Sequence, residues 1–255
     1  MLLRNISKHV KDQNWFAVAL DFIIVVVGIF VGLQVSAWND ARGERQAEIT
    51  ALVALHEDMV STISELQSAT DLTTASNISL RVLAEYADGQ HDNLSVAQID
   101  RHILFGVFRI PGFSPNMVTY GELTNTGRLD LIRNTELRKR LQQLEAEIAE
   151  LRIIGGGIEK MAYEITDVFL LKNYDWRGFV WLNTNNSGTI VDWLEPMKNR
   201  RDVSSALRQP EFLNIVLYRA RLNMGYLNDA NTLSKSLEDI KILIEDRLEQ
   251  AGYEP

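Results

Sequence analysis

One apolar segment near the start of the chain constrains the fold more than any other feature. It runs from Trp15 to Trp38 and contains one charged residue, Asp21. At the α-helical rise, the two tryptophans lie about 34 Å apart, which matches a bilayer core and both of its interfaces. The segment is therefore predicted to be a transmembrane helix. A buried helix of a soluble protein is the alternative, although such helices rarely have so long a stretch without polar side chains.

A cleavable signal peptide is a second alternative for the same segment. Val35-Ser36-Ala37 resembles a small-x-small cleavage site. Against cleavage, the apolar stretch is longer than the roughly 7–15 residues of a signal peptide, and helix-forming sequence continues after Trp38. We therefore expect the segment to be retained.

Basic residues on either side of the span predict its orientation. Three precede it and two follow it closely: Arg4, Lys8, Lys11, Arg42 and Arg45. Basic residues concentrate on the cytoplasmic side of a membrane. This bias favours residues 1–14 as a short cytoplasmic tail, 15–38 as the span, and 39–255 as an extracytoplasmic domain.

Small residues follow one side of the predicted span. Four residues share a helix face because they are spaced by seven, four and four positions: Asp21, Gly28, Gly32 and Ser36. Small residues at this spacing let two helices approach closely in lipid, and a partner would shield Asp21. The pattern predicts self-association or docking on another membrane protein. In the alternative, glycine is simply common in membrane helices and Asp21 reaches the headgroups.

The rest of the chain shows helical periodicity with little strand signal. Its clearest example is an apolar seam with spacings of four, three, four and three: Leu137, Leu141, Leu144, Ile148 and Leu151. Asn134 suits the N-cap of this helix. Gly155-Gly156-Gly157 is expected to break or bend it, because each glycine costs about 1 kcal/mol relative to alanine. Three glycines can equally form a tight packing point or a hinge. The pattern predicts an all-α protein in which the transmembrane helix continues into an antiparallel helical bundle.

An aromatic, asparagine-rich segment near residues 173–199 departs from this periodicity and is expected to form an irregular loop or a small hairpin. It contains Trp176, Trp181 and Trp193. These tryptophans form either a ligand or partner surface, since amphipathic aromatics favour interfaces, or a cap over the core.

A second candidate surface surrounds the proline-containing turn at residues 111–115. Its polar members are Arg101, His102, Arg109, Tyr120 and Glu122. A binding pocket and a buried ion-pair network explain this cluster equally well.

Composition excludes several classes of chemistry. The 255 residues include no cysteine, which excludes disulfides, thiolate zinc sites, iron–sulfur clusters and cysteine nucleophiles. The four histidines lack metal-ligand spacing on one helix, and the GxGxxG and GxSxG signatures do not occur. The net charge of −8 argues against nucleic acid. We therefore expect no catalytic residue, no metal site and no cofactor.

Two stretches of the sequence carry a resemblance. The first, from Val27 to Arg42, contains Leu33-Gln34-Val35-Ser36-Ala37-Trp38-Asn39, and the second runs from Tyr120 to Arg138. They resemble a family of bacterial single-span membrane proteins known as a domain of unknown function, with a Leu-Gln-x-x-x-Trp-Asn-type signature ending its span. Ser36-Ala37 stands where that family usually carries polar amides. The resemblance implies a bacterial membrane protein with a helical domain, and it does not indicate any activity.

Together these observations predict a non-enzymatic, membrane-anchored binding or scaffold protein that presents a helical domain outside the cytoplasm. Its expected partners are the lipid bilayer and either a second copy or another membrane protein. The alternative is an extracytoplasmic sensor that binds a small ligand between helices and acts through a partner membrane protein. An unrecognised hydrolase or transferase is a third hypothesis.

Overall fold

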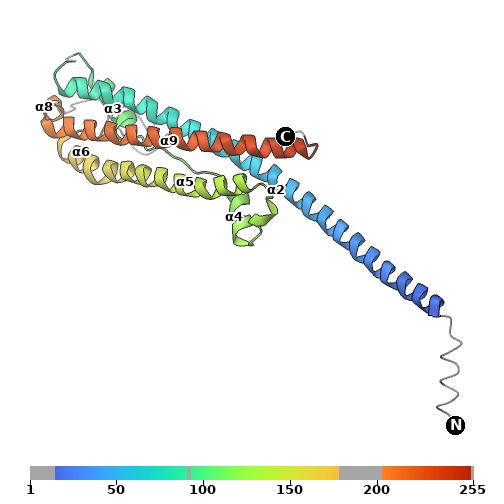
Figure 1. Ribbon diagram of the computed structural model, residues 1–255. Helices are drawn as coiled ribbons and strands as arrows, with labels where there is room; N and C mark the ends of the chain where they lie inside the picture. The colour runs from blue at the N-terminus through green and yellow to red at the C-terminus, as the bar shows by residue number, and fades with distance from the viewer. Residues whose placement is uncertain (1–14, 91–92, 178–202, 254–255) are drawn as a thin grey trace, which may run out of the picture. The chain divides into compact units, whose positions relative to one another are not determined.

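The computed structural model describes residues 15–90, 93–177 and 203–253, and all the elements within these ranges are helical. The expected all-α class is thus confirmed for the described residues. Most of the predicted insertion near 173–199 lies outside them. Internal contacts divide the chain into two units, Met1–Ala51 and Leu52–Pro255. Helix α2, Trp15–Ala87, contributes residues to both units (Figure 1).

The first unit contains the apolar part of α2. An 18-residue window of this helix has a mean hydropathy of 2.0, and none of that window is buried. Among the described residues, α2 is thus the helix long and apolar enough to cross a membrane. At the end of the apolar stretch, the guanidinium of Arg42 lies 5.9 Å from the centroid of a Trp38 ring, which is a cation–π contact.

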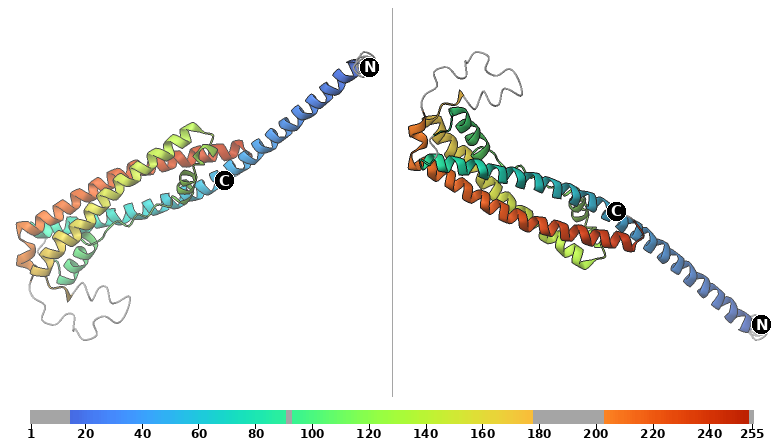
Figure 2. Two further views of the ribbon diagram at one scale, coloured as in Figure 1. Left: turned by 90° about the horizontal axis from the view of Figure 1, so that it is seen from below. Right: turned by 90° about the horizontal axis from the view of Figure 1, so that it is seen from above.

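The second unit contains the end of α2 and the remaining elements. In chain order these are α3 (Val96–Gly106), α4 (Val118–Asn125), the 3-10 turn η1 (Leu129–Leu131), α5 (Thr135–Met161), the π-helical turn η2 (Ala162–Thr166), α6 (Asp167–Asn173), α8 (Ser204–Leu207) and α9 (Pro210–Gln250). Within this unit, α9 runs alongside both the end of α2 and α5 (Figure 2).

Paired contacts show that α9 is antiparallel to both neighbours. Against α5, Arg140 forms an ion pair with Asp239, whereas the much later Gly155 lies beside Tyr226. Against α2, the pairs are His56 with Glu245 and Ser76 with Asn223. In each comparison the residue number rises along one helix and falls along α9.

Local signals explain where several helices begin and end. Ser95 starts α3 with a capping box, in which its backbone N–H donates to Gln98 Oε1 at 2.8 Å. The Asn134 side chain caps α5 as expected, because it accepts a hydrogen bond from the Leu137 N–H at 3.1 Å. Gly127, with a φ of 67°, ends the turn after α4, where the positive φ favours glycine.

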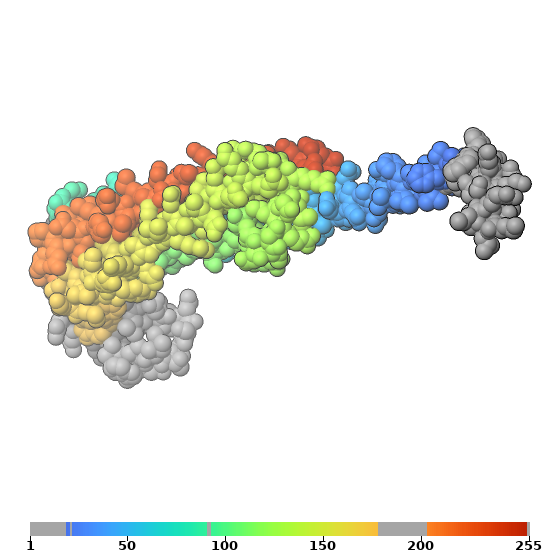
Figure 3. Space-filling view, turned by 60° about the horizontal axis from the view of Figure 1, so that its bottom comes forward, coloured from blue at the N-terminus to red at the C-terminus, as the bar shows by residue number. Residues whose placement is uncertain are grey.

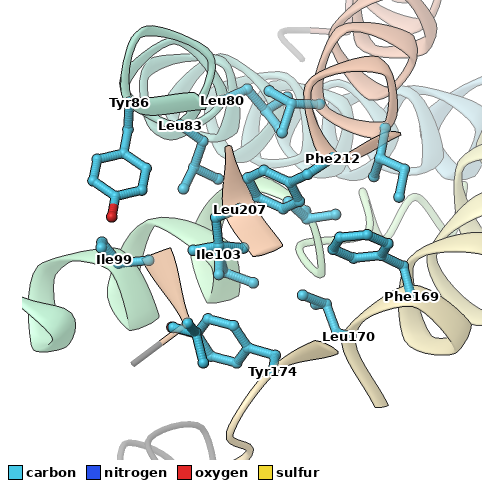
Figure 4. Close-up of a cluster of buried hydrophobic side chains, with 14 of the residues drawn as sticks. Leu80, Leu83, Tyr86, Ile99, Ile103, Phe169, Leu170, Tyr174, Leu207 and Phe212 are labelled. Carbon is cyan, nitrogen blue, oxygen red and sulfur yellow. The ribbon is translucent and has the colours of Figure 1, made fainter. Parts of the chain in front are cut away.

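An apolar cluster fills the end of the second unit that lies near α3, α6 and α8. Its buried members are Leu80, Leu83, Tyr86, Ile99, Ile103, Val107, Met161, Phe169, Leu170, Tyr174, Val203, Leu207, Phe212, Ile215 and Val216. Figure 4 shows labelled members of this cluster, such as Leu83, Ile103 and Phe212, pointing toward one another from several helices. The Phe169 and Phe212 rings stack with their centroids 5.7 Å apart. Tyr174 and Val203, which lie on either side of residues 178–202 in the sequence, therefore belong to the same core.

The seam of α5 is confirmed, but the expected break at Gly155-Gly156-Gly157 is wrong. All five seam residues are buried, and α5 continues through the glycines to Met161. Leu151 and Ile158, which flank the glycines, are buried as well. Burial on both sides stabilises the helix enough to offset the low helix propensity of the three residues between them.

Replacing Gly156 or Gly157 with alanine should raise the free energy of unfolding by about 1 kcal/mol each. An added Cβ would meet nothing within 4 Å at either position, so only the gain in helix propensity remains. Urea unfolding followed by circular dichroism measures this change.

Gly106→Ala is the matched control for these variants. Its Cβ would lie 3.1 Å from Ser79 Cβ and 3.2 Å from the Leu80 backbone nitrogen. This variant should therefore lose stability. A loss of stability in Gly156→Ala would instead contradict the continuous helix that α5 forms through these glycines.

Candidate functional site

The face that α9 turns to the core is polar in its middle. Apolar residues such as Val216 and Leu233 lie on either side, but Arg219, Asn223 and Tyr226 occupy the intervening positions of the same face. All three side chains are at most 1% exposed. Together with Ser76 of α2, which is also buried, they form what we call the polar layer. Burial makes each hydrogen bond in this layer matter, because water cannot replace a missing partner.

Hydrogen bonds connect the polar layer to α2 and to the chain that follows α3. Arg219 Nε donates to Asn223 Oδ1 at 3.1 Å, and Arg219 Nη2 donates to the carbonyl of Arg109. Asn223 Nδ2 donates to Ser76 Oγ at 3.2 Å. The Ser76 hydroxyl in turn donates to the carbonyl of Gly106 at 2.8 Å. The end of α3 and the chain after it are thus tied to α2 and α9.

Two donors in this layer lack hydrogen-bond partners among the described residues. Burial lowers the pKa of Arg219 to about 10 and leaves its Nη1 without a hydrogen-bond partner among the described residues. The hydroxyl of Tyr226 also has none there. Burial raises the pKa of Tyr226 to about 12, so the phenol stays protonated and can donate at neutral pH. Unsatisfied buried donors are uncommon in folded proteins and point to places that accept a further group.

Tyr226 also lines a pocket of about 160 Å³ between α5 and the chain after α3. The other lining residues are Ile110, Pro111, Phe113, Leu151, Arg152, Gly155, Gly156 and Glu159. We call this the glycine pocket. Figure 3 shows the face of the unit on which α5, in yellow-green, is open to solvent beside the orange start of α9.

Four residues of α5 in this pocket share one helix face. Arg152, Gly155, Gly156 and Glu159 stand at positions i, i+3, i+4 and i+7. The two glycines lack side chains, so the helix surface is open between a cation and an anion. Arg152 and Glu159 are both exposed.

Arg152 also lines a second pocket of about 270 Å³ near α4, with Tyr120 and Glu145 in its wall. Tyr120 is buried. Burial, and then the Glu145 carboxylate that accepts its hydrogen bond, raise the pKa of Tyr120. One of the residues predicted from sequence therefore lines a pocket, although not the glycine pocket.

The other residues predicted around the turn have separate contacts. Arg101 is exposed on α3, while His102 is half-buried, with its Nδ1 3.3 Å from Ser79 Oγ. Burial, and then the Arg101 charge, lower the pKa of His102. Arg109 lies over the Phe105 ring at 5.6 Å, and Glu122 is exposed on α4. No three histidine or acidic residues within the described ranges are grouped to hold a metal ion.

The structure describes one of the three tryptophans predicted as a surface. Trp176 is half-buried, with its ring centroid 5.7 Å from that of Phe108. Trp181 and Trp193 lie outside the described residues.

The predicted association face of the span is described in part. Gly28, Gly32 and Ser36 are exposed on α2, and a Cβ added at either glycine would meet nothing within 4 Å. The side chain of Asp21 lies outside the described residues. Association through this face stays a prediction.

Sequence analysis missed the residues of the glycine pocket. Arg152, Gly155, Gly156 and Glu159 have the spacing of one helix face. The glycines were interpreted instead as a break or bend of the helix, or as a tight packing point or hinge. Tyr226 offered no local signal beyond its place on an apolar face.

Replacing Tyr226 with phenylalanine should raise the free energy of unfolding by about 1 kcal/mol, because it removes a buried hydroxyl that has no partner. Thermal and urea unfolding measure the change. Tyr174→Phe is the matched control, since the Tyr174 hydroxyl donates to Asp100 at 2.6 Å and its loss should destabilise the fold. Equal losses in the two variants would show that the Tyr226 hydroxyl is satisfied.

Comparison of the chain with known protein families, with curated proteins and with solved structures finds no match. A functional proposal therefore depends on the exposed apolar surface of α2, the polar layer and the two pockets.

Proposed function

We propose that this chain is a non-enzymatic binding protein, anchored in a membrane by the apolar part of α2 and carrying an antiparallel helical bundle outside the cytoplasm. One observation carries the proposal: an 18-residue window of α2 is strongly apolar, and none of it is buried. Leaving one large apolar side chain in water costs about 1.5–3 kcal/mol relative to burial. A lipid bilayer removes that cost along the whole stretch.

The ends of the apolar stretch support a bilayer as its surroundings. Trp38 is exposed and lies under the guanidinium of Arg42. A tryptophan and an arginine together suit the interface, where an apolar ring and a charged group both find favourable contacts. The basic residues Arg4, Lys8 and Lys11 support a cytoplasmic position for the opposite end. The resemblance to bacterial single-span proteins supports a bacterial inner membrane as the location.

The open glycine face of α2 supports association within the membrane. A Cβ added at Gly28 or Gly32 would meet nothing within 4 Å among the described residues, so a second helix can come close to the backbone there. We take a second copy of this chain as the partner, with another membrane protein as the alternative.

The full-length chain, produced in a bacterium, should remain in the membrane pellet after extraction with sodium carbonate. The double variant Val26→Lys with Phe30→Lys should be released, because a lysine near the centre of a span costs about 2.5–3.5 kcal/mol. Ile78→Lys is the control: Ile78 is 65% exposed in the second unit, so this variant should stay in the membrane. Release of the unaltered chain by carbonate would contradict anchoring.

Native mass spectrometry of the chain in nanodiscs should show a defined oligomer. The double variant Gly28→Ile with Gly32→Ile should shift the mass to a monomer, because the larger side chains hold the backbones apart. Val27→Ile with Val31→Ile is the control, since it places the same isoleucine side chains on a neighbouring face of the same helix. A monomeric unaltered chain would rule out self-association.

A second function, the sensing of a small ligand, is favoured by the glycine pocket. A pocket lined by a buried tyrosine whose hydroxyl has no partner among the described residues is a feature that a ligand-binding bundle needs and a scaffold does not.

A further inference from the structure

The size of the glycine pocket limits what it can hold. Its volume of about 160 Å³ is far above the roughly 10–15 Å³ that a single water needs. It is also below the roughly 300–1,000 Å³ typical of pockets for drug-sized ligands. The space therefore suits a small molecule of several heavy atoms.

The glycines keep this space open without being required by packing. A Cβ added at Gly156 would meet nothing within 4 Å, and one at Gly155 would lie 3.9 Å from Tyr226 Cε2, an ordinary contact. Alanine would therefore fit at both positions and would favour the helix. Because glycine has no side chain, the surface of α5 stays open at these positions and forms the floor of the pocket.

Opposite charges stand at the two ends of that floor. Arg152 and Glu159 are two helical turns apart, about 10.5 Å along the axis, with the glycines between them. Neither has an ion-pair partner within the described part of the chain. Both side chains are long enough to reach a ligand over the glycines. An anion alone would face the Glu159 carboxylate, and a cation alone would face the Arg152 guanidinium.

The wall of the pocket supplies one buried donor and an apolar surface. Tyr226 is 1% exposed and its protonated hydroxyl lacks a partner among the described residues. Such a donor suits a carboxylate oxygen. Ile110, Pro111 and Phe113 provide a surface for a short apolar group.

We propose that the glycine pocket binds a zwitterionic small molecule of amino-acid size, with its carboxylate on Arg152 and Tyr226 and its ammonium group on Glu159. The proposal rests on the binding function proposed above and gives the chemical class of its ligand. A short apolar side chain of the ligand lies against the wall formed by Ile110 and Phe113.

Isothermal titration of the full-length chain in nanodiscs with glycine, L-alanine, L-valine and L-leucine tests this proposal. We expect saturable binding of at least one of them at one site per chain. The matching amide lacks the carboxylate, and the N-acetyl derivative lacks the ammonium group. Each should bind at least tenfold more weakly than the free amino acid.

Three variants test the residues. Arg152→Gln, Glu159→Gln and Tyr226→Phe should each weaken binding at least tenfold. Arg152→Gln should also remove the preference for the free amino acid over its amide. Glu159→Gln should remove the preference for the free amino acid over its N-acetyl derivative. A purely structural role would produce neither change. Lys160→Gln and Glu150→Gln, exposed on α5 outside the pocket, are the controls and should bind normally.

A filled pocket gives an independent test. Gly156→Leu places a side chain where nothing lies within 4 Å of an added Cβ, so the fold should persist while binding is lost. The proposal is overturned if none of the four amino acids binds, or if the amide and N-acetyl derivatives bind as well as the free amino acid. Carbonate extraction of the same chain reports anchoring separately. A retained chain that binds none of them overturns the ligand site alone.

Discussion

Burial of the Arg219 guanidinium is the constraint on which the middle of the second unit depends. A cation without water needs acceptors close by, and the carbonyl of Arg109 and the side-chain amide of Asn223 provide them. The carbonyl reaches this position because the chain after α3 crosses α9 at the same level. That crossing brings Ile110 and Pro111 to the glycines of α5, where they form part of the pocket wall. The chain that supplies the carbonyl to the Arg219 guanidinium thus also forms part of the pocket wall.

Periodicity predicted helices well wherever burial repeats along one element. The seam from Leu137 to Leu151 is buried as its spacing implied, and Asn134 caps the helix through its side chain. The same approach failed at Gly155-Gly156-Gly157, because helix propensity is a local quantity. Gly155 lies beside Tyr226 of α9, and packing of this kind between distant parts of the chain leaves no mark in the nearby sequence.

Most of the candidate site could not be predicted from the sequence, because it is formed by residues that are far apart in the chain. Ser76 and Asn223 are 147 positions apart, and no spacing rule connects them. The residues expected around the turn were close in sequence, yet His102 and Tyr120 contact different elements. The exposed apolar stretch of α2 was the exception, because its length and composition are properties of one continuous segment.

The π-helical turn η2 bears on how related chains would align with this one. Buried residues here recur every four positions, at Ile158, Ala162, Thr166 and Leu170, whereas an α-helix repeats every 3.6 residues. The wider turn absorbs this drift and keeps Leu170 in the core. Removing one residue from η2 would leave about three ordinary α-helical turns between Ile158 and Leu170, so α6 would keep its orientation toward the core. A gap of one residue at this point in an alignment would therefore mark the gain or loss of the π turn, with the packing around Phe169 retained.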